Sequence, residues 1–197
     1  MKKILVILFL SFLLVLLFAT GVMAYNSLTV GLDCRGKWQD TYNGTTIGDA
    51  DTSLGLSIGY EYTSGYDYPL ALGFGVAYQT TGFKDKDGKV DFVPLYLTVK
   101  SISQFDASYL YLVGKTGYNW QYGDSDYTGK GIEKATLGGG LYYAMGFGIA
   151  TTSSNLEFLY SVNNGTYQAN GITADIKYSR ISMIWCINLD PIPQPAL

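Results

Sequence analysis

The 197-residue chain contains no histidine, and this absence limits the chemistry that its side chains support. Serine and aspartate mechanisms that need an imidazole to move the proton are excluded. Paired carboxylates, for example Asp33 with Glu157, remain formally capable of acid–base work. Acids that lie beside Lys and Arg in an interior are more often structural ion pairs. We therefore expect a protein that is not an enzyme and that carries no cofactor.

Alternating carboxylates occur in two polar stretches, Asp85-Lys86-Asp87-Gly88 and Asp124-Ser125-Asp126. Oxygen ligands at this spacing suit Ca²⁺, but the first stretch lacks the downstream Glu of a complete calcium loop. Short Asp-rich stretches that contain Gly usually form turns. We expect no metal site, and a calcium ion bound by these carboxylates is the alternative.

The elements that must position these residues are strands, as the stretch LGGGLYYAMGFGI at 137–149 shows best. Its odd positions are mostly large and apolar, and its even positions are mostly small. A period of two is typical of a β-strand. The stretch is longer than the ~5–6 residues of an ordinary strand, and a tilted strand that crosses a bilayer needs ~9–11.

The same alternation predicts eight strands, at 27–38, 53–62, 70–79, 92–100, 109–120, 137–149, 155–163 and 175–189. Their connections alternate between short and long, and the long ones lie at 39–52, 80–91, 121–134 and 164–174. Short turns at one end and long loops at the other are the rule for outer-membrane barrels. The fold class that we predict is all-β, an eight-stranded antiparallel up-and-down transmembrane β-barrel.

The less apolar face of these strands consists of Gly, Ser, Ala and Tyr with few charges. Charged residues are 15% of the chain, against ~25% in typical soluble domains, so this face would be a poor solvated exterior. It suits the packed interior of a narrow barrel, in which charges of both signs pair. The predicted lumen charges are Asp33, Arg35, Lys37, Glu61, Lys100, Lys115, Glu157, Lys177 and Arg180.

Aromatic residues gather at strand ends, where two membrane interfaces would lie. The predicted interface aromatics are Trp38, Tyr60, Tyr62, Tyr66, Tyr68, Tyr78, Trp120, Tyr122 and Trp185. The same alternation places Cys34 on the lipid face and Cys186 inside. We therefore expect two free thiols, and a disulfide, which would require a β-bulge, is the alternative.

The first 24 residues predict a cleaved Sec-type signal peptide, with a basic start, an apolar run at 4–19 and the cleavage motif Val22-Met23-Ala24. A retained anchor helix is the alternative. Removal of this segment leaves 11 basic against 16 acidic residues, which argues against a nucleic-acid partner. The barrel domain is expected at 25–189, followed by a Pro-rich extended tail at 190–197.

Three segments carry a resemblance to a known family: FVPLYLTVK at 92–100, YLYLVGKTGYN at 109–119 and GGGLYYAMGFGI at 138–149. With them the chain resembles the small bacterial OmpA/OmpX-like outer-membrane β-barrels. The resemblance implies the bacterial outer membrane as location, its lipid and lipopolysaccharide as surroundings, and the barrel assembly machinery as partner during insertion. It implies no catalytic residues. Family members often end on an aromatic residue, whereas this chain ends DPIPQPAL.

The function that we expect is structural, or a surface interaction in which the four long loops contact an extracellular ligand. One alternative is a narrow channel for ions or small solutes, since the Gly-rich strand at 137–149 leaves local space. The second alternative is a soluble periplasmic lipocalin-like barrel, whose apolar face would point inward.

Overall fold

A computed structural model describes residues 24–65, 69–84, 89–105, 108–123, 136–169, 172–190 and 192. The strands are β1 (Ala24–Tyr42), β2 (Thr45–Asp51), β3 (Gly55–Ser64), β4 (Leu70–Gly82), β5 (Lys89–Phe105), β6 (Ser108–Gly123), β7 (Thr136–Gly138), β8 (Gly140–Ala150), β9 (Ser154–Ala169) and β10 (Ile172–Asn188). The predicted signal peptide lies outside the described residues except for Ala24, which begins β1, and its cleavage stays a prediction.

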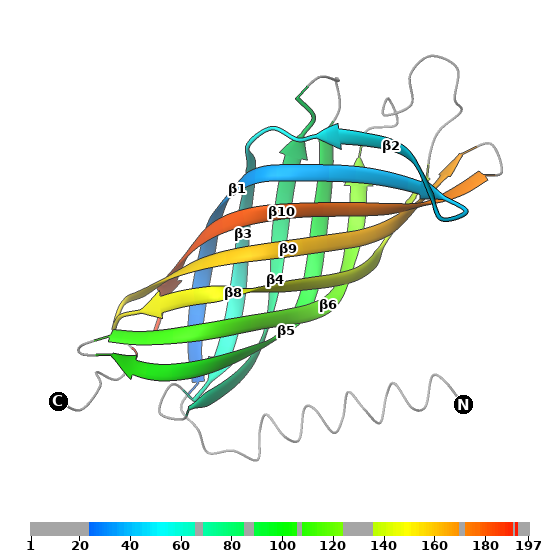
Figure 1. Ribbon diagram of the computed structural model, residues 1–197. Coiled ribbons are helices and arrows are strands. Elements are labelled where there is room, and N and C mark those ends of the chain that lie inside the picture. Colours follow the sequence, from blue (N-terminus) through cyan, green and yellow to red (C-terminus); the bar gives the residue numbers. More distant parts are fainter. Residues whose placement is uncertain are drawn as a thin grey trace, which may run out of the picture.

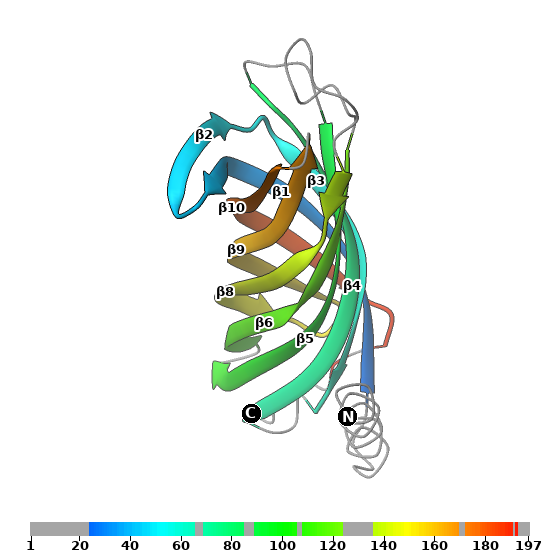
Figure 2. The same ribbon diagram turned by 90° about the vertical axis from the view of Figure 1, so that its right-hand side faces the viewer.

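Eight of these strands close into a ring in the order β10-β1-β3-β4-β5-β6-β8-β9, and the pairing of β9 with β10 completes it (Figures 1 and 2). Every pairing is antiparallel. The two remaining strands, β2 and β7, pair only with β1 and β9 and extend the wall at one end. The predicted eight-stranded up-and-down barrel is therefore confirmed.

Part of the predicted loop at 39–52 is a β-hairpin, because β1 runs on to Tyr42 and β2 folds back along it. Asn43 and Gly44 form its turn with φ angles of 49° and 78°. Two central residues with positive φ match the twist of a hairpin, and Asn-Gly is the favoured sequence. The sequence signal for this hairpin was therefore present.

A β-bulge in β1 reverses its alternation between Cys34 and Lys37. Arg35 and Gly36 together occupy the place opposite Arg180, and Arg35 has a φ of 55°. A side chain at Gly36 would overlap the hydroxyl of Thr52, so the inward position requires glycine. Before the bulge the odd residues of β1 point inward, and after it the even residues do.

Pro94 interrupts the wall between β4 and β5. The register pairs Val76 with Leu95 and Gln79 with Phe92, but no pairing forms between these two positions. Proline has no N–H to donate to the ladder, which accounts for the gap. Since β5 begins at Lys89, Pro94 lies within the strand.

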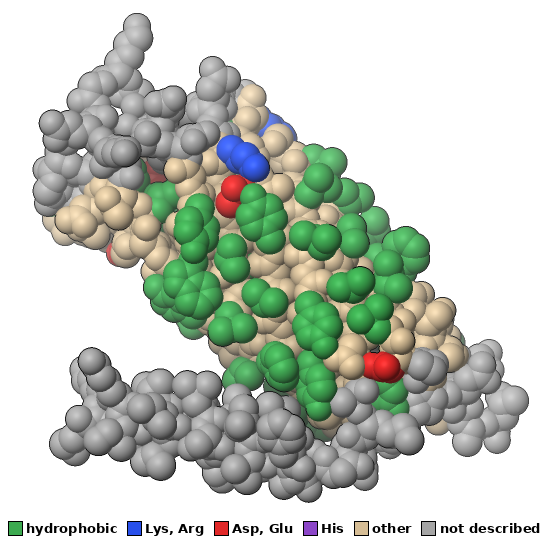
Figure 3. All heavy atoms as spheres, turned by 180° about the vertical axis from the view of Figure 1, so that it is seen from behind, with side chains coloured by type: hydrophobic (Ala, Val, Ile, Leu, Met, Phe, Trp, Pro, Cys, Tyr) green, Lys and Arg blue, Asp and Glu red, His purple; other side chains and the backbone are tan. Residues whose placement is uncertain are grey.

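The outer wall of the barrel is apolar, and Figure 3 shows hydrophobic side chains spread over one side of it. Exposed members include Leu28, Val30, Leu56, Ile58, Leu72, Leu95, Leu112, Met145, Phe147 and Ile181. Six charged residues of the same ring of strands, Asp33, Glu61, Lys100, Lys115, Glu157 and Arg180, are buried inside the barrel. A soluble barrel has the opposite arrangement, so this wall faces lipid. Among the described residues, no helix has the length and apolar character to cross a membrane.

Candidate functional site: the filled lumen

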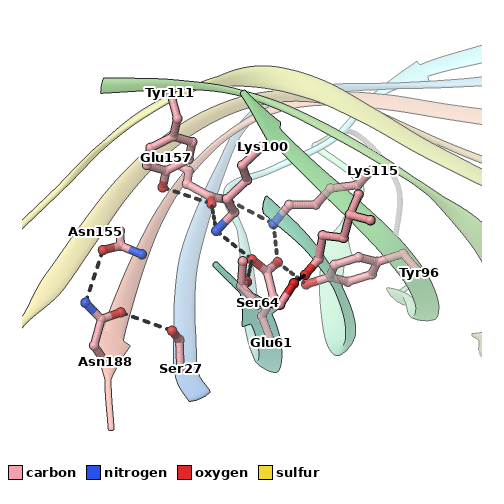
Figure 4. Close-up of polar contacts among 12 residues, drawn as sticks. Ser27, Glu61, Ser64, Tyr96, Lys100, Tyr111, Lys115, Asn155, Glu157 and Asn188 are labelled. Carbon is pink, nitrogen blue, oxygen red and sulfur yellow. Dashed lines mark hydrogen bonds and ion pairs between the residues drawn. The ribbon is translucent and has the colours of Figure 1, made fainter. Parts of the chain in front are cut away.

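Four charged side chains meet inside the barrel and form a closed quartet (Figure 4). Glu61 comes from β3, Lys100 from β5, Lys115 from β6 and Glu157 from β9. The Nζ of Lys100 lies 2.7 Å from Glu61 Oε1 and 3.0 Å from Glu157 Oε1. The Nζ of Lys115 lies 2.7 Å from Glu61 Oε2 and 2.8 Å from Glu157 Oε2. Each ammonium group therefore lies between both carboxylates.

Two tyrosines complete the hydrogen bonding of the carboxylates. Tyr96 donates its hydroxyl to Glu61 over 3.1 Å, and Tyr111 donates to Glu157 over 3.0 Å. Their rings also lie near the ammonium groups, with Lys115 Nζ at 5.1 Å from the centre of the Tyr96 ring and Lys100 Nζ at 5.0 Å from that of Tyr111. At these distances the ring faces attract the cations.

Glycines opposite these tyrosines make room for the rings. A Cβ on Gly75 would lie 2.6 Å from Cζ of Tyr96, and one on Gly148 would overlap the ring of Tyr111. Because the two glycines on β4 and β8 have no side chains, the tyrosine rings from β5 and β6 occupy the space beside them. The small residues that the alternation places inside therefore leave space that aromatic side chains fill.

The quartet is neutral and is shielded from solvent, since all four side chains are at most 2% exposed. Burial of a lone charge costs several kcal/mol, and only well-placed partners offset that cost. With two cations and two anions alternating, every charge has two opposite neighbours. The arrangement links four strands of the ring across the lumen.

A second buried ion pair links β1 to β10. Arg180 Nη1 lies 2.8 Å from Asp33 Oδ2, and Ser182 donates its hydroxyl to Asp33 Oδ1 over 2.6 Å. Arg180 also donates from Nε to the hydroxyl of Ser161 over 3.0 Å. This pair joins the strands at which the barrel closes, so the first and last strands are connected by charge as well as by the ladder.

Toward the long-loop end the lumen is filled by an aromatic cluster, made of Trp38, Phe83, Val90, Phe92, Ile176 and Tyr178. Phe92 and Tyr178 stack with their ring centres 5.0 Å apart, and Trp38 meets Phe83 edge-on at 5.6 Å. Trp38 Nε1 donates to Asp40 Oδ1 over 2.7 Å, which satisfies its one polar atom. This end of the lumen is thus closed by packing rather than by charge.

This architecture is similar to that of several solved structures. The crystal structure of the outer membrane protein OprG from Pseudomonas aeruginosa is similar, with a TM-score of 0.58 and 12% identity over 85% of this chain and 95% of that one. The chain has the fold of a small outer-membrane β-barrel. Neisserial surface protein A is also similar, with 16% identity, 81% and 96% coverage and a TM-score of 0.49. Ail of Yersinia pestis follows with 10% identity, 84% and 99% coverage and a TM-score of 0.48. No family model and no curated protein sequence matches.

The barrel turns six of the nine predicted lumen charges inward: Asp33, Glu61, Lys100, Lys115, Glu157 and Arg180. For the other three, Arg35, Lys37 and Lys177, the interior placement is wrong because all are exposed. The bulge moves Arg35 and Lys37 out of the inward phase, and Lys37 pairs with Asp49 on the surface at 3.4 Å. Lys177 lies between the inward residues Ile176 and Tyr178, so it belongs to the outer face.

The predicted interface aromatics divide into several groups. Tyr78, Trp120, Tyr122 and Trp185 are exposed on the outer wall. Tyr60 and Tyr62 are half-buried. The prediction for Trp38 is wrong, because the bulge turns it into the aromatic cluster, where it is 0% exposed. Tyr66 and Tyr68 lie outside the described residues.

The sequence analysis did not identify the two tyrosines that hydrogen-bond to the quartet. It also did not identify the aromatic cluster. Tyr96 and Tyr111 sit at inward positions of their strands and both face glycines across the ladder, at Gly75 and Gly148. That pairing of a large with a small residue was a signal that the sequence contained. The strand register that places each tyrosine opposite a glycine, however, is known only from the structure of the ring.

Both cysteines are free, with Cys34 exposed on the wall and Cys186 buried inside. The acidic stretch 85–88 and Asp124-Ser125-Asp126 lie outside the described residues. Within the described part of the chain, no three His, Cys, Asp or Glu side chains gather into a group that could hold a metal ion.

Proposed function

We propose that the chain is an integral outer-membrane protein with a closed lumen, which serves a structural role or contacts an external ligand through its long-loop end. The observation that carries this proposal is the filled lumen inside a lipid-facing wall. The charged quartet lies between two apolar clusters, one at each end of the barrel. A barrel filled in this way offers its outer ends for function, because its interior is occupied by its own side chains.

The apolar outer wall of the barrel supports a proposal about the surroundings of the protein. We propose outer-membrane lipid and lipopolysaccharide around it, export by the signal peptide at 1–24, and insertion by the barrel assembly machinery. The described parts of the segments 39–52, 80–91, 121–134 and 164–174 lie at the same end of the ring. A ligand that binds there would contact the β1–β2 hairpin, which stands beyond the ring (Figure 2).

A narrow channel has less support than a closed barrel. We expected the Gly-rich strand at 137–149 to leave space for one. The space that Gly148 leaves is filled by the Tyr111 ring, and Gly146 faces the backbone of Phe158 closely. A soluble lipocalin-like barrel disagrees with the exposed apolar wall, since its apolar face would line a ligand cavity.

Two measurements on the same protein test the proposal. An envelope fraction run on SDS gels, unboiled and boiled, should show a band that shifts on boiling and stays with the membrane pellet after carbonate treatment. The purified barrel in planar bilayers should then show no stepwise conductance. Release into the soluble periplasmic fraction would contradict the membrane assignment, and regular single-channel steps would contradict the closed lumen.

A further inference from the structure

At the short-turn end of the barrel, Asn188 ends β10, and the described residues Leu189, Asp190 and Ile192 come after it. Asn188 N–H donates to Ser153 O over 3.0 Å, and Leu189 N–H donates to Asn26 O over 2.7 Å. The carboxylate of Asp190 accepts from Asn26 twice, from the backbone N–H over 3.2 Å and from Nδ2 over 2.6 Å. Ile192 N–H then donates to Thr152 O over 3.0 Å. Leu189 and Asp190 are therefore tied to β1, and Asn188 and Ile192 are tied to the β8–β9 turn.

Ile192 is inserted among inward-facing residues and is only 1% exposed. Its cluster draws on the short-turn ends of several strands: Tyr25, Ala71, Ile102, Tyr109, Tyr111, Val113, Ala150 and Leu159. A branched apolar side chain at the centre of such a ring removes both itself and its neighbours from water. The sequence pattern predicts that this residue belongs to a Pro-rich extended tail at 190–197.

We propose that Leu189, Asp190 and Ile192 form a built-in stopper, in which Ile192 fills an apolar socket and closes the short-turn mouth of the barrel. The proposal rests on the closed lumen described above and adds a second, separate closure to it. The quartet closes the lumen with charge at mid-height. The stopper closes the mouth with an apolar side chain that belongs to no strand, and so it is able to withdraw without breaking the ring.

The contacts of the stopper suggest how it is held. Its backbone bonds reach one strand, β1, and one turn, between β8 and β9, and Asp190 is its charged anchor on Asn26. Segments held by a few contacts at the end of a fold open locally at less cost than the ring unfolds. Loss of the Ile192 side chain should therefore open the mouth and leave the ladder intact.

Cys186 provides a reporter inside the barrel. It is 1% exposed, points inward and lies two residues before the end of β10, with Asn155 on β9 and Thr29 on β1 as its ladder partners. The other thiol, Cys34, is on the outer wall, so Cys34→Ser leaves Cys186 as the single thiol of the chain. A water-soluble thiol reagent can reach it only through an open end.

The test measures the rate at which a charged methanethiosulfonate reagent modifies Cys186 in the folded Cys34→Ser barrel. In the added Ile192→Gly background the rate should rise at least about tenfold, because local opening sets access. Ile192→Leu should restore a slow rate, since it refills the socket. Leu189→Gly is the matched control in the same segment, because Leu189 is 54% exposed and fills no socket.

The outcomes separate the stopper from unfolding and from the proposed function. Each variant must keep its heat-modifiable band, which shows that the ring is closed. Equal modification rates in Ile192→Gly and its parent would overturn the stopper, as would equal acceleration by Leu189→Gly. Conductance of the parent barrel would overturn the closed lumen but leave the rate difference at Cys186 as it is.

Discussion

The charged quartet and the aromatic cluster fill the same lumen, but they depend on their neighbours in different ways. In the quartet each group needs two partners of opposite sign at 2.7–3.0 Å. In the aromatic cluster around Trp38, rings 5.0–6.3 Å apart fill volume mainly by packing against one another. Loss of one charge leaves another uncompensated, whereas loss of ring volume leaves a space that neighbours partly fill. The two regions should therefore respond differently to equally small changes.

The largest effect is expected from Glu157→Ala, which leaves Lys100 and Lys115 with one carboxylate between them. We expect a loss of about 3–5 kcal/mol in the free energy of unfolding, because a buried pair is broken on one side. Urea unfolding in lipid vesicles measures it. The matched variant is Lys115→Met with Glu157→Leu, which removes a neutral pair and should cost less than the single change. A double variant less stable than the single one would show that the charges act independently.

The next effect tests the fit between glycine and tyrosine. Gly148→Ala places a methyl group against the Tyr111 ring and should push its hydroxyl away from Glu157. Overpacking of this kind costs about 1–3 kcal/mol. Tyr111→Phe separates the two contributions, because it removes the hydrogen bond and keeps the ring. If Gly148→Ala unfolds at the same urea concentration as the parent, the ring has room that the structure does not show.

The aromatic cluster should tolerate a change of shape better than the quartet tolerates a change of charge. Phe92→Leu keeps an apolar side chain at the stack with Tyr178 and should cost less than about 1.5 kcal/mol. The same unfolding assay compares it with Glu157→Ala. A cost as large as that of the charge variant would remove the distinction between the two regions.

The smallest effect is expected outside the lumen. Lys37 and Asp49 form an ion pair at 3.4 Å with both side chains more than half exposed. Exposed pairs contribute about 0.2–1 kcal/mol, and salt screens them, so Lys37→Ala should lie at the lower limit of detection. A large loss of stability would mean that Lys37 acts through a contact other than Asp49.

How much the sequence could predict depended on the local backbone. The alternation found the ring strands and turned six lumen charges inward, because a strand repeats every two residues. It failed after Cys34, since the bulge at Arg35 and Gly36 changes the phase and leaves no periodic trace. Trp38 and Lys37 were therefore assigned to each other's faces. The quartet was beyond prediction, because the stagger of the closed ring decides which strands face one another across the lumen.

The Asn43–Gly44 turn makes this barrel a scaffold for peptide display. The turn joins two strands that extend past the ring, and Gly44 has open space around it, with no atom within 4 Å of the position of a side chain. Exposed loop tips tolerate insertions best, since no buried backbone is disturbed. A foreign epitope placed between Asn43 and Gly44 would be carried on a two-stranded stalk away from the wall. Neither the quartet nor the lipid-facing surface would have to accommodate it.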